Sequence, residues 1–133
     1  MEEITFKTKE KNEIIDITSS VERKLEESNI KEGICVVYVV HATAGIIINE
    51  NWDDSVQEDL LQMLKELAPE GRWKHDKIDG NGASHVKAGL IGPSETIIVS
   101  QGKLVLGQWQ NIFLCEFDGP RTERKVLVKI IGK

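Results

Sequence analysis

The chain has 133 residues, of which 40% are hydrophobic and 29% are charged. This length suits one domain with a buried core, and the composition is ordinary for a globular protein. The net charge of -5, with both signs interspersed, argues against a general nucleic-acid binder. The N-terminus lacks the apolar segment of a signal peptide, and no apolar run could span a bilayer. We therefore expect a single domain over residues 1–133 that is cytoplasmic and binds neither nucleic acid nor membrane.

The first elements are predicted to be two strands and a helix. Apolar and polar residues alternate over 2–9, and isoleucines recur over 14–17, as in half-buried strands. The turn at Lys11–Asn12 favours a hairpin between these strands. A capping-box pattern at Ser19–Glu22 then opens a short helix, which ends near Asn29.

Two strongly apolar strands follow. Residues 33–40 are apolar at both parities and rich in β-branched side chains, which predicts a central strand covered on both faces, or nearly so. Residues 45–49 form a second, shorter run of the same kind. Cys35 and Cys115 lie in apolar runs without a CxxC motif, so buried reduced thiols are favoured over a disulfide.

The middle of the chain contains two predicted helices and a polar loop. The first helix begins near Asp54, ends before Pro69, and carries an apolar stripe that we assign to core packing: Val56, Leu60, Leu61, Met63, Leu64 and Leu67. The loop over 71–83 has the length of a functional or disordered segment. Ser84 is then predicted to cap a short helix that runs from His85 to Leu90.

The last third is rich in predicted strands, which lie over 95–100, 103–106, 109–117 and 124–131. Consecutive strands with tight turns predict antiparallel pairing. The predicted fold class is α+β. It consists mainly of antiparallel, sandwich-like sheets, with two or three helices inserted in the first two-thirds of the chain.

The chain has three histidines, and each lies in a suggestive place. His41 ends a predicted central strand, His75 lies in the polar loop, and His85 begins a predicted helix, where the helix dipole favours the neutral ring. Three neutral imidazoles with an open fourth position form a common catalytic zinc site. Because there is no HExxH motif, three unrelated histidines are the more frequent outcome of such spacing.

Two carboxylates could take part in chemistry. Glu50 lies between a buried strand and a helix, where it could act as a general base or merely complement the helix dipole. Glu116 alternates with apolar neighbours and either lines a pocket or is solvated.

Three further features could bind a phosphorylated ligand. The small residues of Gly80–His85 could hold a phosphate with backbone N–H groups, although most such loops are simple turns. Arg121 and Arg124 could grip a phosphate or lie in a solvated turn. Trp109 could stack on a ring or only pack.

Five blocks in order carry a resemblance to a known family. They are His41-Ala42-Thr43-Ala44-Gly45, Asn49-Glu50-Asn51, Gly82-Ala83-Ser84-His85-Val86-Lys87-Ala88, Leu106-Gly107-Gln108-Trp109-Gln110 and Glu116-Phe117-Asp118-Gly119-Pro120-Arg121. In this order they resemble the YjbQ family, described as secondary thiamine-phosphate synthase-like. The resemblance runs from about Ile4 to Gly132. The family commonly has a second small hydroxylated residue where this chain has Ala42.

The resemblance implies a small α+β sandwich that assembles as a homotrimer. It also implies a histidine cluster, matching His41, His75 and His85, that holds a divalent metal. Zinc is the expected metal and magnesium the alternative. The ascribed activity is a weak condensation of a pyrimidine diphosphate with a thiazole phosphate. A metal-dependent hydrolase of a small phosphorylated metabolite and a non-enzymatic, trimeric metabolite-binding protein are the alternatives.

Residues and resemblance together predict one site. Glu50 and His41 are the expected catalytic residues. The expected substrate-binding residues are Thr43, Asn49, Asn81, Gly82, Ser84, Gln108, Trp109, Glu116 and Arg121.

Overall fold

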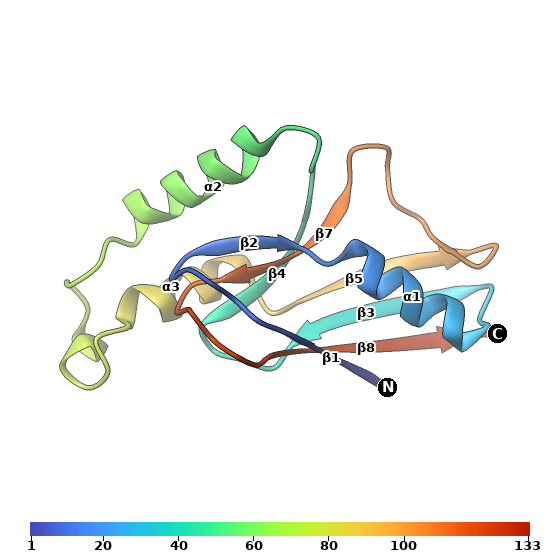
Figure 1. Cartoon of the computed structure of the whole chain (residues 1–133), viewed down its shortest axis with the longest axis horizontal. Coiled ribbons are helices and arrows are strands. Elements are labelled where there is room, and N and C mark those ends of the chain that lie inside the picture. The colour runs from blue at the N-terminus through green and yellow to red at the C-terminus, as the bar shows by residue number, and fades with distance from the viewer.

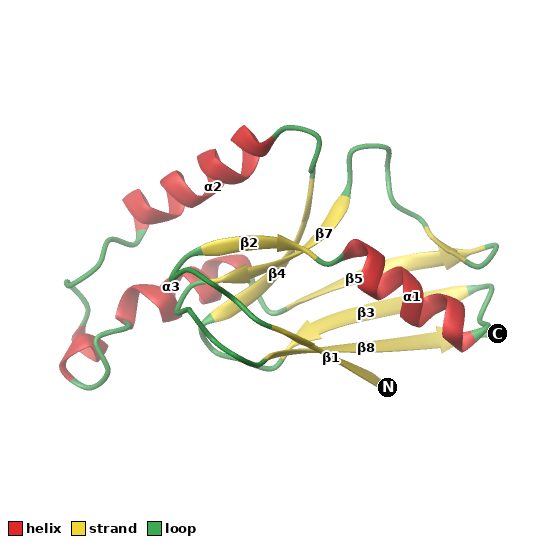
Figure 2. Ribbon diagram, in the orientation of Figure 1, coloured by secondary structure: helices red, strands yellow, loops and turns green.

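The computed structural model describes all 133 residues, Met1 to Lys133. Figures 1 and 2 show a two-sheet core with helices packed around it. The strands are β1 (Glu2–Phe6), β2 (Glu13–Asp16), β3 (Gly33–Val39), β4 (Ala44–Asn49), β5 (Ser94–Ser100), β6 (Lys103–Leu104), β7 (Asn111–Glu116) and β8 (Arg124–Gly132). The helices are α1 (Thr18–Ser28), α2 (Asp54–Leu67), the short 3-10 helix η1 (Lys74–Lys77) and α3 (Gly82–Ile91).

The strands form two antiparallel sheets. The large sheet has the order β1-β8-β3-β5-β6, and the small sheet has the order β2-β7-β4. This confirms the predicted α+β class with antiparallel sheets and three inserted helices. The predicted hairpin between the first two strands is wrong, because β1 and β2 lie in different sheets. The chain crosses between the sheets near Thr8, whose backbone N–H donates to the Arg121 carbonyl at 2.9 Å.

The main hydrophobic core lies between the two sheets and is closed by α1. It contains Ile17, Val21, Leu25, Cys35, Val37, Val39, Ala44, Ile46, Ile97, Val99, Ile112, Leu114, Val126 and Val128. In β3 only the inward residues are buried, whereas Ile34 and Tyr38 on the other face are exposed. The prediction of a strand covered on both faces is therefore wrong for β3.

The strand that is buried on both faces is β7, in the centre of the small sheet. One face contributes to the main core. The other face carries Cys115 and packs in a second cluster with Leu64 of α2 and Ala88 of α3. The layers are therefore the large sheet, the small sheet and the two helices α2 and α3.

Helix α2 matches its predicted range but packs less of its surface than expected. The Asp53 side chain caps it by accepting a hydrogen bond from the Ser55 backbone at 2.9 Å. Only Leu64 is buried, whereas Met63 and Leu67 are more than half exposed. The prediction that the whole apolar stripe packs in the core is therefore wrong, and Figure 1 shows α2 along one side of the molecule.

Helix α3 begins three residues earlier than predicted, at Gly82. The Ser84 hydroxyl is not a cap, because it donates instead to the Phe117 carbonyl at 2.6 Å. The Asp76 carboxylate accepts from the Gly82 backbone at 2.7 Å. A Cβ at position 82 would come within 2.3 Å of Cβ of Trp73, so only glycine allows this close approach.

The register of β4 against β7 defines two ends of the small sheet. Ala44 pairs with Glu116 at one end, and Asn49 pairs with Asn111 at the other. We call the first the histidine end (residues 41–44, 75–85 and 116–121). The second is the tryptophan end (residues 49–53 and 106–111). At about 3.4 Å per residue, the strand between Ala44 and Asn49 separates them by about 17 Å.

Candidate functional site

A cavity of about 430 Å³ lies at the histidine end. It is lined by Tyr38, Val39, Val40, His41, Ala42, Ala44, His85, Ala88, Gly89 and Pro93, and we call it the histidine pocket. His41 comes from the loop between β3 and β4, and His85 comes from α3. The His75 ring stands edge-on to the His85 ring, with 4.7 Å between the ring centroids. The fold therefore gathers all three histidines at one end of the small sheet.

His41 is held as a neutral ring of one tautomer. Its Nε2 accepts a hydrogen bond from the Lys125 backbone at 2.9 Å, so the remaining ring proton lies on Nδ1. Burial lowers the pKa of His41, and the nearby charge of Arg124 lowers it further, against the opposing effect of Glu116. At neutral pH His41 can therefore donate a hydrogen bond through Nδ1 but has no free lone pair.

The predicted three-histidine metal site does not fit the side chains of a single chain. No group of three or more His, Cys, Asp or Glu side chains is arranged to hold a metal ion. His41 has no free lone pair, and a metal ligand needs one. The Nε2 atom of His75 is buried without a hydrogen-bond partner and lies 3.3 Å from an oxygen of Asp79.

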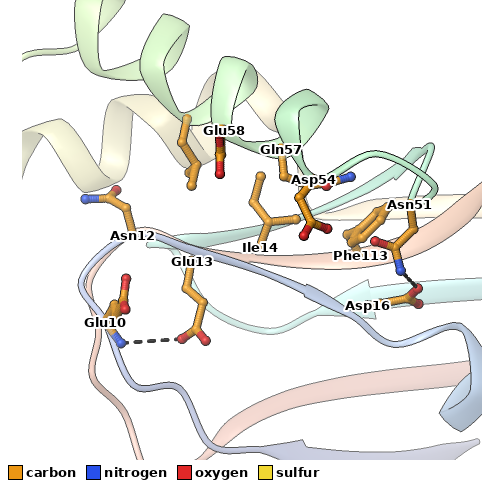
Figure 3. Close-up of a pocket in the computed structure, with 11 residues that line it drawn as sticks. Glu10, Asn12, Glu13, Ile14, Asp16, Asn51, Asp54, Gln57, Glu58 and Phe113 are labelled. Atoms are coloured by element: carbon orange, nitrogen blue, oxygen red, sulfur yellow. Dashed lines mark hydrogen bonds between the residues drawn. The ribbon is translucent and has the colours of Figure 1, made fainter.

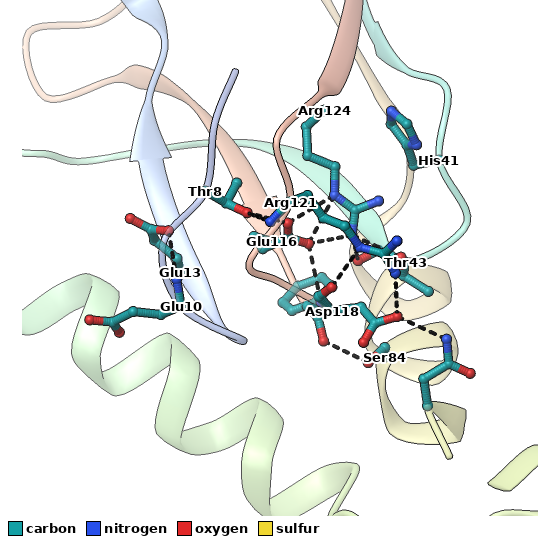
Figure 4. Close-up of polar contacts among 12 residues, drawn as sticks. Thr8, Glu10, Glu13, His41, Thr43, Ser84, Glu116, Asp118, Arg121 and Arg124 are labelled. Atoms are coloured by element: carbon teal, nitrogen blue, oxygen red, sulfur yellow. Dashed lines mark hydrogen bonds and ion pairs between the residues drawn. The ribbon is translucent and has the colours of Figure 1, made fainter. Parts of the chain in front are cut away.

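A buried ion pair supports the floor of the histidine end (Figure 4). Glu116 is inaccessible to solvent and Arg124 is 3% exposed. Nε of Arg124 donates to the carboxylate oxygens of Glu116 at 2.9 and 3.0 Å, and an NH2 group of Arg124 donates to the Thr43 hydroxyl at 2.9 Å. Burial alone would raise the pKa of Glu116, but the hydrogen bonds from Arg124 and Thr8 lower it below its usual value.

This ion pair changes the roles of three predicted site residues. Glu116 and Thr43 hold Arg124 and are not open to a substrate, although both were predicted to contact one. Arg124, which we considered a phosphate ligand, is buried and paired with Glu116 inside the protein. Ser84 is likewise buried, with its hydroxyl bonded to the backbone.

Arg121 remains an accessible cation at this end. Its side chain is about half exposed, and it donates to the Asp118 carboxylate at 2.9 Å. The same carboxylate oxygen accepts from Nδ2 of Asn81 at 2.9 Å, which ties the start of α3 to the loop after β7. Oδ1 of Asn81 is buried without a partner, as is Nε2 of His75. A buried polar atom without a partner costs roughly 1–3 kcal/mol, so such atoms often mark a binding site.

Sequence reasoning missed two residues that shape this end. Asp118 lies inside one of the resemblance blocks, and its position between Glu116 and Arg121 could have indicated its role. Thr8 donates to the Glu116 carboxylate at 2.6 Å from 108 positions away in the sequence. No local signal could have found Thr8, because the contact exists only after the sheets pack.

The remaining predicted residues lie at the tryptophan end. Asn49 and Glu50 follow β4, and Gln108 and Trp109 precede β7. The Trp109 ring stands edge-on to Trp52 with 5.7 Å between centroids. The single site predicted from the sequence is therefore divided in this chain into two groups at opposite ends of the small sheet.

A second cavity, of about 350 Å³, lies between β2 and α2 (Figure 3). Its lining includes five carboxylates, from Glu10, Glu13, Asp16, Asp54 and Glu58. Such a concentration of negative charge disfavours an anionic ligand. The histidine pocket, with its neighbouring arginines, is the better candidate for a phosphorylated ligand.

Comparison with known proteins identifies the family. A family model described as UPF0047 protein YjbQ-like matches residues 2–133. The chain belongs to the YjbQ family.

The relatives of this YjbQ family member span nearly its whole length. A UPF0047 protein of Methanocaldococcus jannaschii is 48% identical over 96% of this chain and 91% of its own. The UPF0047 protein YugU of Bacillus subtilis is 44% identical over 97% of both chains. These matches confirm the resemblance predicted from the five blocks.

Solved structures of YjbQ family members share the fold. A YbjQ-like protein from Sulfolobus solfataricus, described as being of unknown function, superposes with a TM-score of 0.96 at 44% identity, covering 99% of this chain and 96% of its own. A YjbQ/UPF0047 protein from Clostridium acetobutylicum superposes with a TM-score of 0.94 at 47% identity, covering 98% and 100%. No helix of this chain has both the length and the apolar composition of a membrane span.

Proposed function

We propose that this YjbQ family member binds a small phosphorylated metabolite in the histidine pocket. The observation that carries the proposal is the cavity that His41 and His85 share, together with the positive charges of Arg121, Arg124 and Lys125 that act on His41. Burial is the main cause of the lowered pKa of His41, and the charges of Arg124, Arg121 and Lys125 lower it further, against the opposing charge of Glu116. A site in which cations and hydrogen-bond donors converge favours an anionic ligand.

The side chains have distinct proposed roles. The Nδ1–H of His41 donates a hydrogen bond to the ligand. Arg121 turns its exposed guanidinium from Asp118 toward a phosphate group, which it can bind through two N–H groups. His85, on the facing wall, is the candidate general acid or base.

The reaction implied by the family resemblance is the first candidate activity. Joining a pyrimidine diphosphate to a thiazole phosphate releases pyrophosphate, and Arg121 would balance the charge of that leaving group. Hydrolysis of a phosphorylated metabolite is the alternative reaction. A divalent metal, zinc or magnesium, and a homotrimeric assembly remain proposals; the metal would need ligands beyond those that one chain gathers.

Binding without turnover is the second candidate function, and one observation favours it. The base predicted from the sequence, Glu50, follows the far end of β4 from the pocket. The carboxylate nearest the floor, Glu116, is buried and paired with Arg124. Because both nitrogens of His41 are occupied, His85 is the one histidine of the pocket that a single chain offers as a proton acceptor.

One experiment separates these functions. The metal content of the native protein is measured, and the protein is incubated with phosphate esters and with the thiamine precursor pair, beside His85→Ala. Turnover by the native protein that is lost in His85→Ala supports the enzyme. Binding of a phosphorylated compound without turnover supports the binding protein. If no phosphorylated compound binds or reacts, the proposed function is wrong.

A further inference from the structure

We propose that Lys87 is a reactive amine that forms an imine with a small, neutral aldehyde. Lys87 lines a cavity of about 650 Å³, which we call the α2 cavity. The rest of the lining comes from α2 and the segment after it, together with Asn12. The α2 cavity adjoins the cavity of Figure 3, since Asn12 and Glu58 line both, but it shares no residue with the histidine pocket. The inference therefore goes beyond the proposed function and does not depend on it.

Lys87 is a buried lysine on a helix that also contributes to the histidine pocket. Only 3% of Lys87 is exposed, although lysine is almost never fully buried unless it is paired. His85, two positions earlier on α3, lines the histidine pocket. Side chains two positions apart on a helix do not share a face. Helix α3 therefore presents His85 and Lys87 to two different cavities.

The Lys87 amine has one hydrogen-bond partner in the chain. Its Nζ donates to Oδ1 of Asn12 at 3.0 Å. A carboxylate oxygen of Glu70 lies 3.9 Å from Nζ, which is beyond hydrogen-bond distance. The other carboxylate oxygen of Glu70 lies 3.5 Å from Nζ of Lys11, so Lys87 shares this negative charge with a second cation. An ammonium ion has three N–H groups to satisfy and burial disfavours its charge, so this site suits a neutral amine.

A neutral lysine amine beside a cavity can add to a carbonyl carbon. The lone pair of Nζ forms the new N–C bond, and an electron pair of the C=O bond moves to the oxygen. Both protons of the amine then pass to that oxygen, with the Glu70 carboxylate as carrier, and the oxygen leaves as water. A C=N bond replaces the C=O bond, and nothing is oxidised or reduced. Glu70 is thus the proposed proton carrier of the step.

The lining of the α2 cavity favours a neutral aldehyde over an anionic carbonyl compound. Three of the lining residues are carboxylates, namely Glu58, Glu66 and Glu70, and they disfavour a negatively charged ligand. Leu61 and Pro69 line the same cavity and offer apolar contact to a short carbon chain. The expected ligand is therefore a small, uncharged aldehyde.

Trapping with borohydride tests the proposal, because borohydride reduces an imine to a stable secondary amine. The native protein is incubated at pH 7.5 with propanal, reduced and digested, and mass spectrometry measures how fast each lysine is propylated. Lys125 is the internal comparison. Its Nζ also lies 3.9 Å from a carboxylate oxygen, that of Glu3, but its side chain is 45% exposed and lines no part of the α2 cavity. We expect Lys87 to be propylated at least ten times faster than Lys125.

Two glutamine variants separate the chemistry from simple accessibility. Glu70→Gln should slow the propylation of Lys87 tenfold or more, because a positioned proton carrier typically contributes about 10²–10⁴-fold. Glu3→Gln is the matched control, since the side chains of Glu3 and Glu70 are 49% and 47% exposed, and it should leave the rate at Lys87 unchanged. Both changes lie at half-exposed side chains, so neither is expected to unfold the protein.

The folded cavity must be the source of the preference. In concentrated urea, Lys87 and Lys125 should be propylated at similar rates, because the α2 cavity is then absent. A preference for Lys87 that persists in urea would overturn the inference. Propylation of Lys87 in the native protein at or below the rate of Lys125 would also overturn it, as would equal rates at Lys87 in Glu70→Gln and Glu3→Gln.

Discussion

Arg124 connects several groups of the histidine end. Its guanidinium bonds to Glu116, to the Thr43 hydroxyl and to the Thr43 carbonyl, and its charge lowers the pKa of His41. Because both members of the Arg124–Glu116 pair are buried, each depends on the other to offset the loss of hydration.

Removing either partner should destabilise the fold strongly. We expect Arg124→Met to lower the free energy of unfolding by about 3–5 kcal/mol, because it leaves the Glu116 carboxylate buried and unpaired. Arg121→Met removes a half-exposed ion pair and should cost about 1 kcal/mol or less. Urea unfolding of the two variants checks this, and equal losses would show that the burial of the Arg124–Glu116 pair is unimportant.

The same pair predicts acid sensitivity. The pKa of Glu116 is lower in the folded chain than its ordinary value of 4.5. Its stabilising contribution is therefore complete above that value and is lost as the pH falls through the folded pKa. Between pH 6 and pH 3, the melting temperature should fall more steeply in the native protein than in Glu116→Gln. The variant has no carboxylate to protonate at this position. Parallel curves would contradict the assignment.

His41 should remain neutral at pH 7 with its proton on Nδ1. Its pKa is lowered below the ordinary 6.5, so the folded state favours the neutral ring. Stability should therefore fall as the pH drops below the unfolded value of about 6.5. Long-range ¹H–¹⁵N NMR of the imidazole nitrogens reports both the tautomer and the titration. A proton on Nε2, or titration above pH 6.5, would exclude the proposed donor role.

At the scale of elements, local sequence patterns predicted the residue ranges of most helices and strands. They did not predict which strands pair with one another. The periodicity of 54–67 predicts α2 because helix spacing is a local property. The pairing of β1 with β8 instead of β2 depends on contacts across the whole chain. Whether one or both faces of β7 and β3 are buried depends on which layers pack against each strand. An apolar run with both parities hydrophobic does not specify those layers.

Helix α2 gives the clearest element-scale prediction. Leu64 is 4% exposed and packs in the second core cluster, whereas Met63 at the preceding position is about half exposed. We expect Leu64→Ala to cost about 2–5 kcal/mol of unfolding free energy, and Met63→Ala about 0.5 kcal/mol or less. Chemical denaturation of both variants tests this packing. A large loss in Met63→Ala would show that α2 is covered by a further surface.

At the scale of the whole molecule, the site could be predicted only in pieces. The sequence singled out His41 and His85 because polar residues at the ends of buried strands are unusual, and the fold places both in one cavity. It also grouped Glu50 and Trp109 with them, although β4 separates the two groups. Sequence order cannot distinguish a site within one chain from a site shared between copies.

Pyrophosphate binding to the histidine pocket is the most direct test of the proposed function. Calorimetric titration of the native protein should show binding that Arg121→Ala and His85→Ala each weaken roughly tenfold or more, since a hydrogen bond to a charged group contributes about 1.5–3 kcal/mol. The control Lys129→Ala removes an exposed positive charge from β8 and should bind like the native protein. No binding by the native protein, or equal affinity in all three variants, would contradict a phosphorylated ligand in this pocket.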